Sequence, residues 1–177
     1  YQRALLGMDS TGRGGMIARI ITEHNLALAF VQMGETLEAE TVLHDVLRRA
    51  ARASPTEAPP NQPLIHYAET ALFQGRADSA QKYFGVIVAQ AVRDTNLFWE
   101  GRGLFGLARA QVRLGALADA RKSLERFRRI LAVYPHVQDT DDQVPDDAAL
   151  EGLLALATGD TSAAHDSASG LDAGSPR

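Results

Sequence analysis

Histidine is the residue type in this sequence that is best suited to catalysis or metal binding, because its ring nitrogens can bind metals or transfer protons near neutral pH. The five histidines are His24, His44, His66, His136 and His165. No two of them have the i, i+4 spacing with an intervening glutamate that a helical zinc site requires. Glu23 and His24 form a small acid–base cluster, but the sequence brings no nucleophile to them. We therefore expect no catalytic residue, no bound metal and no other cofactor, and we do not predict an enzyme.

Two further segments carry part of the pattern of a ligand-binding loop. Residues 12–15 are rich in glycine and precede a predicted helix, but no Gly-Lys-Ser/Thr ending and no preceding strand accompany them. The acidic run from Asp139 resembles the start of a calcium loop, yet Val144 stands where glycine is needed and Leu150 where glutamate is needed. We interpret both segments as connections between helices.

Composition narrows the class of protein. The chain has 177 residues, of which 45% are hydrophobic and 23% charged, as is typical of one globular domain with a sizeable core. It has no cysteine, and no apolar run approaches the roughly 20 residues that span a bilayer. Residues 1–129 hold 17 Lys and Arg against 13 acids, an excess too small to predict nucleic-acid binding, whereas residues 130–177 hold one Arg against nine acids. We expect a cytoplasmic protein that binds neither membranes nor nucleic acids.

A repeat of about forty residues is the strongest signal in the sequence. It is marked by four glycines, spaced 41, 40 and 44 residues apart, which are Gly34, Gly75, Gly115 and Gly159. A small residue stands seven positions before each glycine and an alanine five positions after it. Because glycine readily takes the left-handed conformation that ends a helix, each glycine is predicted to join two antiparallel helices. Small residues at the matching positions would let the two helix axes approach closely, with Leu43, Phe84 and Leu124 filling the adjacent groove.

The repeat predicts an all-α fold of about eight helices plus the end of a preceding one. The helices are expected at roughly 16–33, 36–53, 63–74, 77–93, 96–114, 117–133, 147–158 and 161–169. They pair into hairpins at about 16–53, 63–93, 96–133 and 147–169, with connections at 9–15, 54–63 and 134–145. Each hairpin can bury its apolar face only by stacking on the next, so we predict one solenoid domain over residues 1–169. Residues 1–6 are expected to end a preceding repeat of a longer array, and residues 170–177 to form a frayed tail.

The spacing of small residues, glycine and alanine resembles the tetratricopeptide repeat family, most closely at Ala108, Gly115, Ala120 and Leu124. The resemblance covers nearly the whole chain and implies a right-handed solenoid. Two features depart from the family. The period exceeds the usual 34 residues or so, and Val46, Ile87 and Phe127 replace a small residue near the end of the second helix. Such elongated repeats are similar to those of large bacterial signalling proteins, including regulatory regions attached to kinases and transcription factors.

The resemblance also implies a concave groove, lined by the first helix of each hairpin, that binds a protein or peptide. The groove positions carried over by alignment are His24, Leu28 and Gln32; Ile65, His66, Glu69 and Phe73; and Arg102, Phe105, Arg109 and Arg113. The three arginines fall within a band about 40° wide on one helix, and arginine suits bidentate capture of carboxylates. We therefore expect a partner segment with acidic and apolar residues. The family's clamp for C-terminal carboxylates is not predicted, because His24 and Leu28 occupy its lysine and asparagine positions.

Other interpretations of these residues stay open. Glu69 and Arg109 hold equivalent places in neighbouring repeats and could pair with each other, which would make the arginines structural. Phe73 and Phe105 could belong to the core between repeats instead of a binding face. The alternative function is a regulatory or oligomerisation segment of a larger bacterial signalling protein, which would dock on a second copy or on its parent domains.

Overall fold

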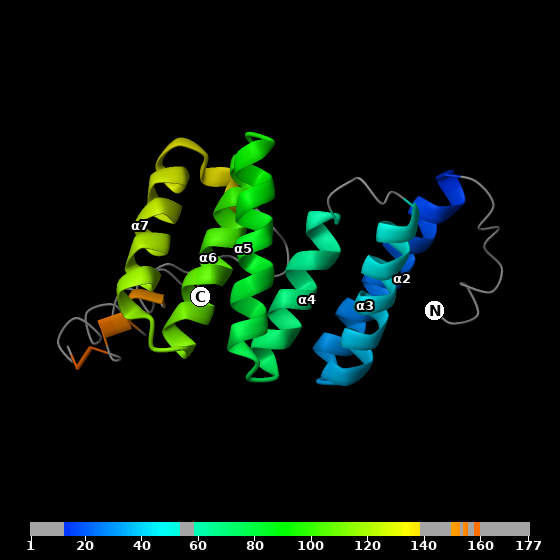
Figure 1. Ribbon diagram of the computed structural model, residues 1–177, viewed down its shortest axis with the longest axis horizontal. Coiled ribbons are helices and arrows are strands. Elements are labelled where there is room, and N and C mark those ends of the chain that lie inside the picture. Colours follow the sequence, from blue (N-terminus) through cyan, green and yellow to red (C-terminus); the bar gives the residue numbers. More distant parts are fainter. Residues whose placement is uncertain (1–12, 54–58, 139–149, 153, 156–157, 160–177) are drawn as a thin grey trace, which may run out of the picture. The chain divides into compact units, whose positions relative to one another are not determined.

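The computed structural model describes residues 13–53, 59–138, 150–152, 154–155 and 158–159 (Figure 1). These residues confirm the all-α prediction, since helices account for the regular structure and no described residue lies in a strand. The elements are α2 (Arg13–Gln32), α3 (Thr36–Ala53), α4 (Asn61–Phe73), α5 (Ala77–Arg93), α6 (Leu97–Arg113), α7 (Leu117–Val133) and the 3-10 helix η1 (Pro135–Gln138). Helical residues also occur at 150–152 and 154–155, inside the helix predicted at 147–158.

The predicted bounds of α3, α5 and α7 agree with the structure, and those of the other helices differ by one to three residues. The connection predicted to reach residue 15 ends earlier, because α2 already begins at Arg13. Likewise α4 begins at Asn61, so Pro63 lies inside its first turn. Proline is tolerated there because the amide it lacks would have no partner within the helix. The elements predicted at 1–6, 161–169 and 170–177 lie outside the described residues.

The predicted glycines do close the helices in the left-handed conformation. Their φ angles are 77° at Gly34, 77° at Gly75, 73° at Gly115 and 76° at Gly159. After the first three, the next amide donates a 2.9 Å hydrogen bond to the carbonyl five residues earlier, with Glu35 bonded to Phe30, Arg76 to Ala71 and Ala116 to Gln111. This hydrogen bond defines the Schellman motif, which satisfies a helix-end carbonyl and reverses the chain.

The junction between α5 and α6 makes the same kind of turn without glycine. The Asn96 amide donates to the Ala91 carbonyl at 2.8 Å, and Thr95 takes the left-handed position with φ 53°. A β-branched residue is strained in this conformation because its side chain crowds the backbone. Asn96 then caps α6, since its Oδ1 accepts a hydrogen bond from the Trp99 amide at 3.2 Å.

The chain divides into two compact units, Tyr1–Arg76 and Ala77–Arg177, and each is described by itself. In the first unit α3 packs against both α2 and α4. The α3–α4 pair is antiparallel, because Glu40 near the start of α3 contacts Arg76, just after the end of α4, at 2.7 Å and accepts from Tyr67 in the middle of α4 at 3.2 Å. Ala27, Ala39 and Leu43 are fully buried, as expected of the small and apolar residues around Gly34. Stacking of all the hairpins into one solenoid stays a prediction.

In the second unit α6 packs between α5 and α7. One buried cluster among its described residues consists of Leu104, Ala108, Ala120, Leu124, Phe127, Ile130, Val137, Leu150 and Leu154. Three glycines inside α6 allow this close packing. A Cβ at Gly106 would overlap the ring of Phe84, and one at Gly103 would lie 2.9 Å from Val88 Cγ2. The α5 and α6 backbones are therefore closer together than side chains at these positions would permit.

Candidate functional site

One stripe of α6 carries aromatic and arginine side chains that are not fully buried. Eight of the 17 residues of this helix are buried, namely Glu100, all three internal glycines, Leu104, Ala108, Ala110 and Gln111. Five of the others are called the α6 stripe below, and these are Phe98, Arg102, Phe105, Arg109 and Arg113. The first four are half-buried and the last is exposed. Their spacing of three or four residues places all of them on one side of the helix.

Aromatic rings and guanidinium groups alternate along the α6 stripe. The Arg102 guanidinium lies 5.9 Å from the centre of the Phe98 ring, and that of Arg109 lies 5.7 Å from the centre of the Phe105 ring. Such cation–π contacts orient the flat guanidinium group, whose N–H donors point along its edge. The Arg102 guanidinium, held in this way, is prepared for a bidentate hydrogen bond to a carboxylate.

Phe105 also contributes to the interior of the second unit. Its ring centre lies 5.4 Å from that of the fully buried Phe127, and it packs against the core residues of this unit. The ring therefore supports Arg109 from a fixed position. Phe98 was missed at the sequence level, although it stands four residues before Arg102, a spacing at which helical side chains meet.

The structure brings three of the predicted residues together in the first unit. His24 on α2 and His66 on α4 have ring centres 4.7 Å apart. His66 Nδ1 lies 3.1 Å from Glu69 Oε2, so Glu69 has a partner within its own unit. His24 is only 4% exposed, and neither of its ring nitrogens has a hydrogen-bond partner. Burial, and then the charge of His66, lower the pKa of His24 to about 4.

The other predicted residues of the first unit differ in exposure. Ile65 is buried and Leu28 half-buried, whereas Gln32 and Phe73 are exposed. The Phe73 side chain is 54% exposed, so it does not belong to the core. Phe105, in contrast, is half-buried. Whether these side chains and the α6 stripe line one groove stays a prediction, because the two units are described separately.

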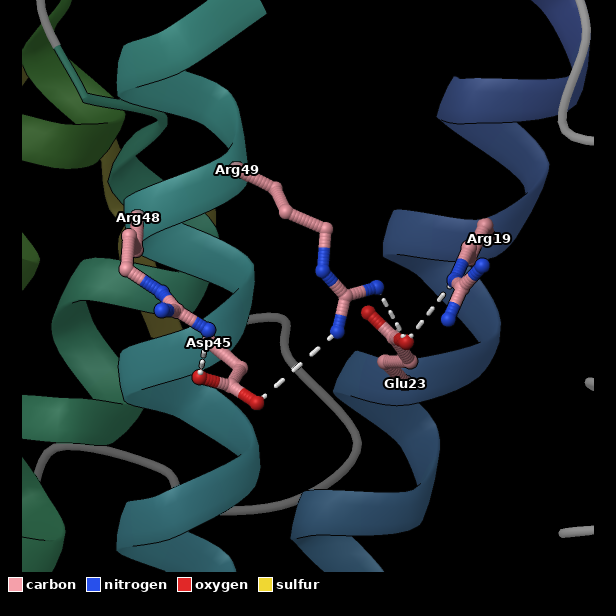
Figure 2. Close-up of polar contacts among 5 residues, drawn as sticks. All are labelled: Arg19, Glu23, Asp45, Arg48 and Arg49. Atoms are coloured by element: carbon pink, nitrogen blue, oxygen red, sulfur yellow. Dashed lines mark hydrogen bonds and ion pairs between the residues drawn. The ribbon is translucent and has the colours of Figure 1, made fainter.

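A buried carboxylate links α2 to α3 (Figure 2). Glu23 Oε1 accepts from Arg19 Nε at 3.0 Å and from Arg49 Nη1 on α3, while Asp45 contacts both Arg48 and Arg49. The Glu23 side chain is 6% exposed. Because two guanidinium groups share its Oε1, Glu23 joins the helices instead of facing His24 as an acid–base partner.

The second unit contains a matching ion pair, which also escaped sequence reasoning. Glu100 on α6 accepts from Arg126 on α7, with Nη2 at 2.7 Å and Nε at 2.9 Å. In both hairpins the acid and the arginine are 26 residues apart. An acid on the first helix followed by an arginine at that separation is the signal that could have revealed these pairs.

Among the described residues, no three His, Asp or Glu side chains come together in a way that could hold a metal ion. No helix in the described ranges combines the length and the apolar character needed to cross a membrane.

Comparison with known proteins found no match to this chain among family models, curated proteins or solved structures. The resemblance to tetratricopeptide repeats therefore rests on the residues of this sequence alone.

Proposed function

We propose that this chain is a protein-interaction module that binds a partner segment through the α6 stripe. The observation that carries the proposal is the pairing of Arg102 with Phe98 and of Arg109 with Phe105 on the partly open side of a well-packed helix. Such a stripe offers apolar ring surface and guanidinium donors side by side. The partner that fits it carries acidic and apolar residues in the same short segment.

The rigidity of α6 supports this proposal. The helix is packed on both neighbours and capped by Asn96, so its side chains project from a fixed backbone. Fixed arginines and aromatic rings lose little conformational freedom on binding, and both residue types dominate the binding energy of protein interfaces. No catalytic step is part of the proposal, and a cytoplasmic location remains our expectation.

A peptide selection tests the proposal. Random peptides displayed on phage are selected on the immobilised chain, and their affinities are measured for the unmodified chain and for two double variants. Arg102→Glu with Arg113→Glu reverses charge on the α6 stripe. Arg121→Glu with Arg129→Glu is the matched control, because both residues are exposed on α7 and the net charge changes equally.

The selected peptides should be rich in Asp and Glu next to apolar residues. The α6 variant should bind them at least about tenfold more weakly, because each charge-assisted hydrogen bond contributes about 1.5–3 kcal/mol. The α7 control should retain its affinity. Equal affinities of the two variants, with both still folded by circular dichroism, would show that the α6 stripe is not the binding surface.

The arrangement of the hairpins belongs to the same proposal. We propose that they stack as in tetratricopeptide repeats, so that the α6 stripe would continue into a groove with Gln32 and Phe73. The repeated Schellman turns and the fully buried Ala27, Ala68 and Ala108 support it. Small-angle X-ray scattering would test it, because a curved stack and two loosely joined units have different distance distributions.

A second candidate function is a regulatory or oligomerisation segment of a larger bacterial signalling protein. Exposed apolar side chains favour it, because Met33, Leu37 and Phe73 are 61%, 70% and 54% exposed. Met33 follows the end of α2, Leu37 lies in the first turn of α3, and Phe73 is the last residue of α4. The antiparallel packing of α3 and α4 places Leu37 and Phe73 towards the same end of the first unit. Sedimentation equilibrium is the test: self-association that Leu37→Lys abolishes favours this candidate, and a strict monomer at all concentrations counts against it.

A further inference from the structure

The contact between His24 and His66 has an unusual chemical environment. The two rings are tilted by 52° and connect α2 with α4, the two helices of the first unit that share the fewest contacts. A neutral imidazole carries one N–H donor and one acceptor nitrogen. Both nitrogens of His24 are buried without a partner, so even its neutral form leaves hydrogen-bonding capacity unsatisfied.

The charged groups around this contact have partners other than His24, although the second carboxylate oxygen of Glu23, Oε2, is buried without a hydrogen-bond partner. On α4, Glu69 contacts His66, and on α2, Glu23 contacts Arg19. On α3, Asp45 is bonded to Arg48 and Arg49, and Arg49 also reaches Glu23, while Glu40 accepts from Tyr67 and Arg76. None of these carboxylates is bonded to His24. When His24 is protonated, its two N–H groups therefore have no hydrogen-bond acceptor in the closed structure.

We infer that the contact between His24 and His66 is an acid-sensitive joint, which opens α2 away from α4 when His24 is protonated while the second unit keeps its fold. Protonation gives His24 two buried N–H donors and a positive charge beside a second imidazole. Burial of an unpaired charge is strongly unfavourable, and separating the helices hydrates the ring. The second unit has its own core, and no histidine is among the residues of its described core cluster.

The direction of the pH dependence follows from the two states of the joint. In the closed state the pKa of His24 is lowered from 6.5 to about 4, first by burial and then by the charge of His66. In the open state the ring regains its ordinary value. Between these values the open state binds more protons, so acid favours opening. From pH 7 to pH 5 the opening equilibrium should rise about 20-fold.

Hydrogen exchange of the complete chain at pH 7 and pH 5 tests the inference, with each rate divided by the intrinsic exchange rate at that pH. Protection of the α2 and α4 amides should fall about 20-fold, whereas protection in α5, α6 and α7 should change by less than about threefold. In His24→Leu, which cannot titrate, protection in α2 and α4 should not depend on pH. The control His44→Leu, at an exposed position on α3, should retain the 20-fold fall.

Two results of the exchange experiment would overturn the inference. One is an equal loss of protection in His24→Leu, because another group would then be responsible. The other is a proportional loss in all helices of the unmodified chain, because acid would then unfold the protein as a whole. If His24→Leu does not fold, NMR titration of the His24 ring in the unmodified chain decides: a midpoint well below 6.5 supports the joint, and one near 6.5 refutes it.

Discussion

Adding one methyl group at Gly106 should change stability through two opposing effects, a gain in helix propensity and a cost of overpacking. Replacing an internal helical glycine with alanine usually stabilises a protein by about 1 kcal/mol, because alanine has the higher helix propensity. At Gly106 the new Cβ would overlap the ring of Phe84, which is fully buried and cannot move towards solvent. Overpacking of this kind costs about 1–3 kcal/mol. The overlap is severe, so we expect Gly106→Ala to lower the free energy of unfolding by about 1–2 kcal/mol.

Gly85 provides the matched control on the neighbouring helix. It lies inside α5, and a Cβ built there meets nothing within 4 Å. Gly85→Ala should therefore show the propensity gain alone, about 0.5–1 kcal/mol of added stability. The two variants change the same atoms in the same type of element. The free energies of unfolding of the two variants should thus differ by about 1.5–3 kcal/mol, with one variant less stable and the other more stable than the unmodified chain.

Urea denaturation followed by circular dichroism measures both variants, and comparison of the m values confirms that the same surface unfolds. A double variant tests whether contact with the Phe84 ring causes the loss of stability. Phe84→Leu removes the ring that the new methyl group meets, so Gly106→Ala should destabilise less in that background. If Gly106→Ala were as stable as Gly85→Ala, the close approach of α5 and α6 described above would be wrong.

Three further substitutions have defined outcomes. Thr95→Gly should raise the melting temperature by a few degrees, equivalent to about 1 kcal/mol, because Thr95 has φ 53° and glycine adopts that conformation without strain. Gly115→Ala should have the opposite effect of similar size in the same thermal melt, since φ at Gly115 is 73° although space around it is open. Ser123→Ala should cost about 1–3 kcal/mol in urea denaturation, because the buried Gln111 Oε1 loses the donor that lies 2.8 Å away. An unchanged midpoint for Ser123→Ala would mean that water reaches Gln111.

Features that depend on one hairpin could be predicted from the sequence. Gly34, Gly75 and Gly115 require a left-handed conformation that few other residues adopt, so their spacing located the helix ends to within a few residues. The α5–α6 junction follows from the helices predicted at 77–93 and 96–114, yet its strained Thr95 could not be foreseen, because threonine has no preference for that conformation. The conformation of such a turn depends on residues close to it in the sequence, so its position can be predicted from the sequence.

Features that depend on neighbouring helices were harder to predict. The three arginines of the α6 stripe were assigned to one side of a helix by periodicity alone, but the placement of Phe98 beneath Arg102 was not recognised. His24 and His66 were expected on an open face, and their contact became visible only once α2 and α4 were placed beside each other. The glycines inside α6 suggested nothing by themselves, because their role depends on Phe84 and Val88 on another helix.

The glycines of α6 also bear on how the second unit folds. Each internal glycine lowers the intrinsic helix propensity by about 1 kcal/mol relative to alanine, so Gly101, Gly103 and Gly106 leave an isolated α6 segment with little tendency to be helical. Contact with α5 and α7 has to supply the missing stabilisation. The side chains of the α6 stripe are therefore aligned only after its neighbours have docked, and a ligand that requires this alignment would stabilise the whole second unit against unfolding.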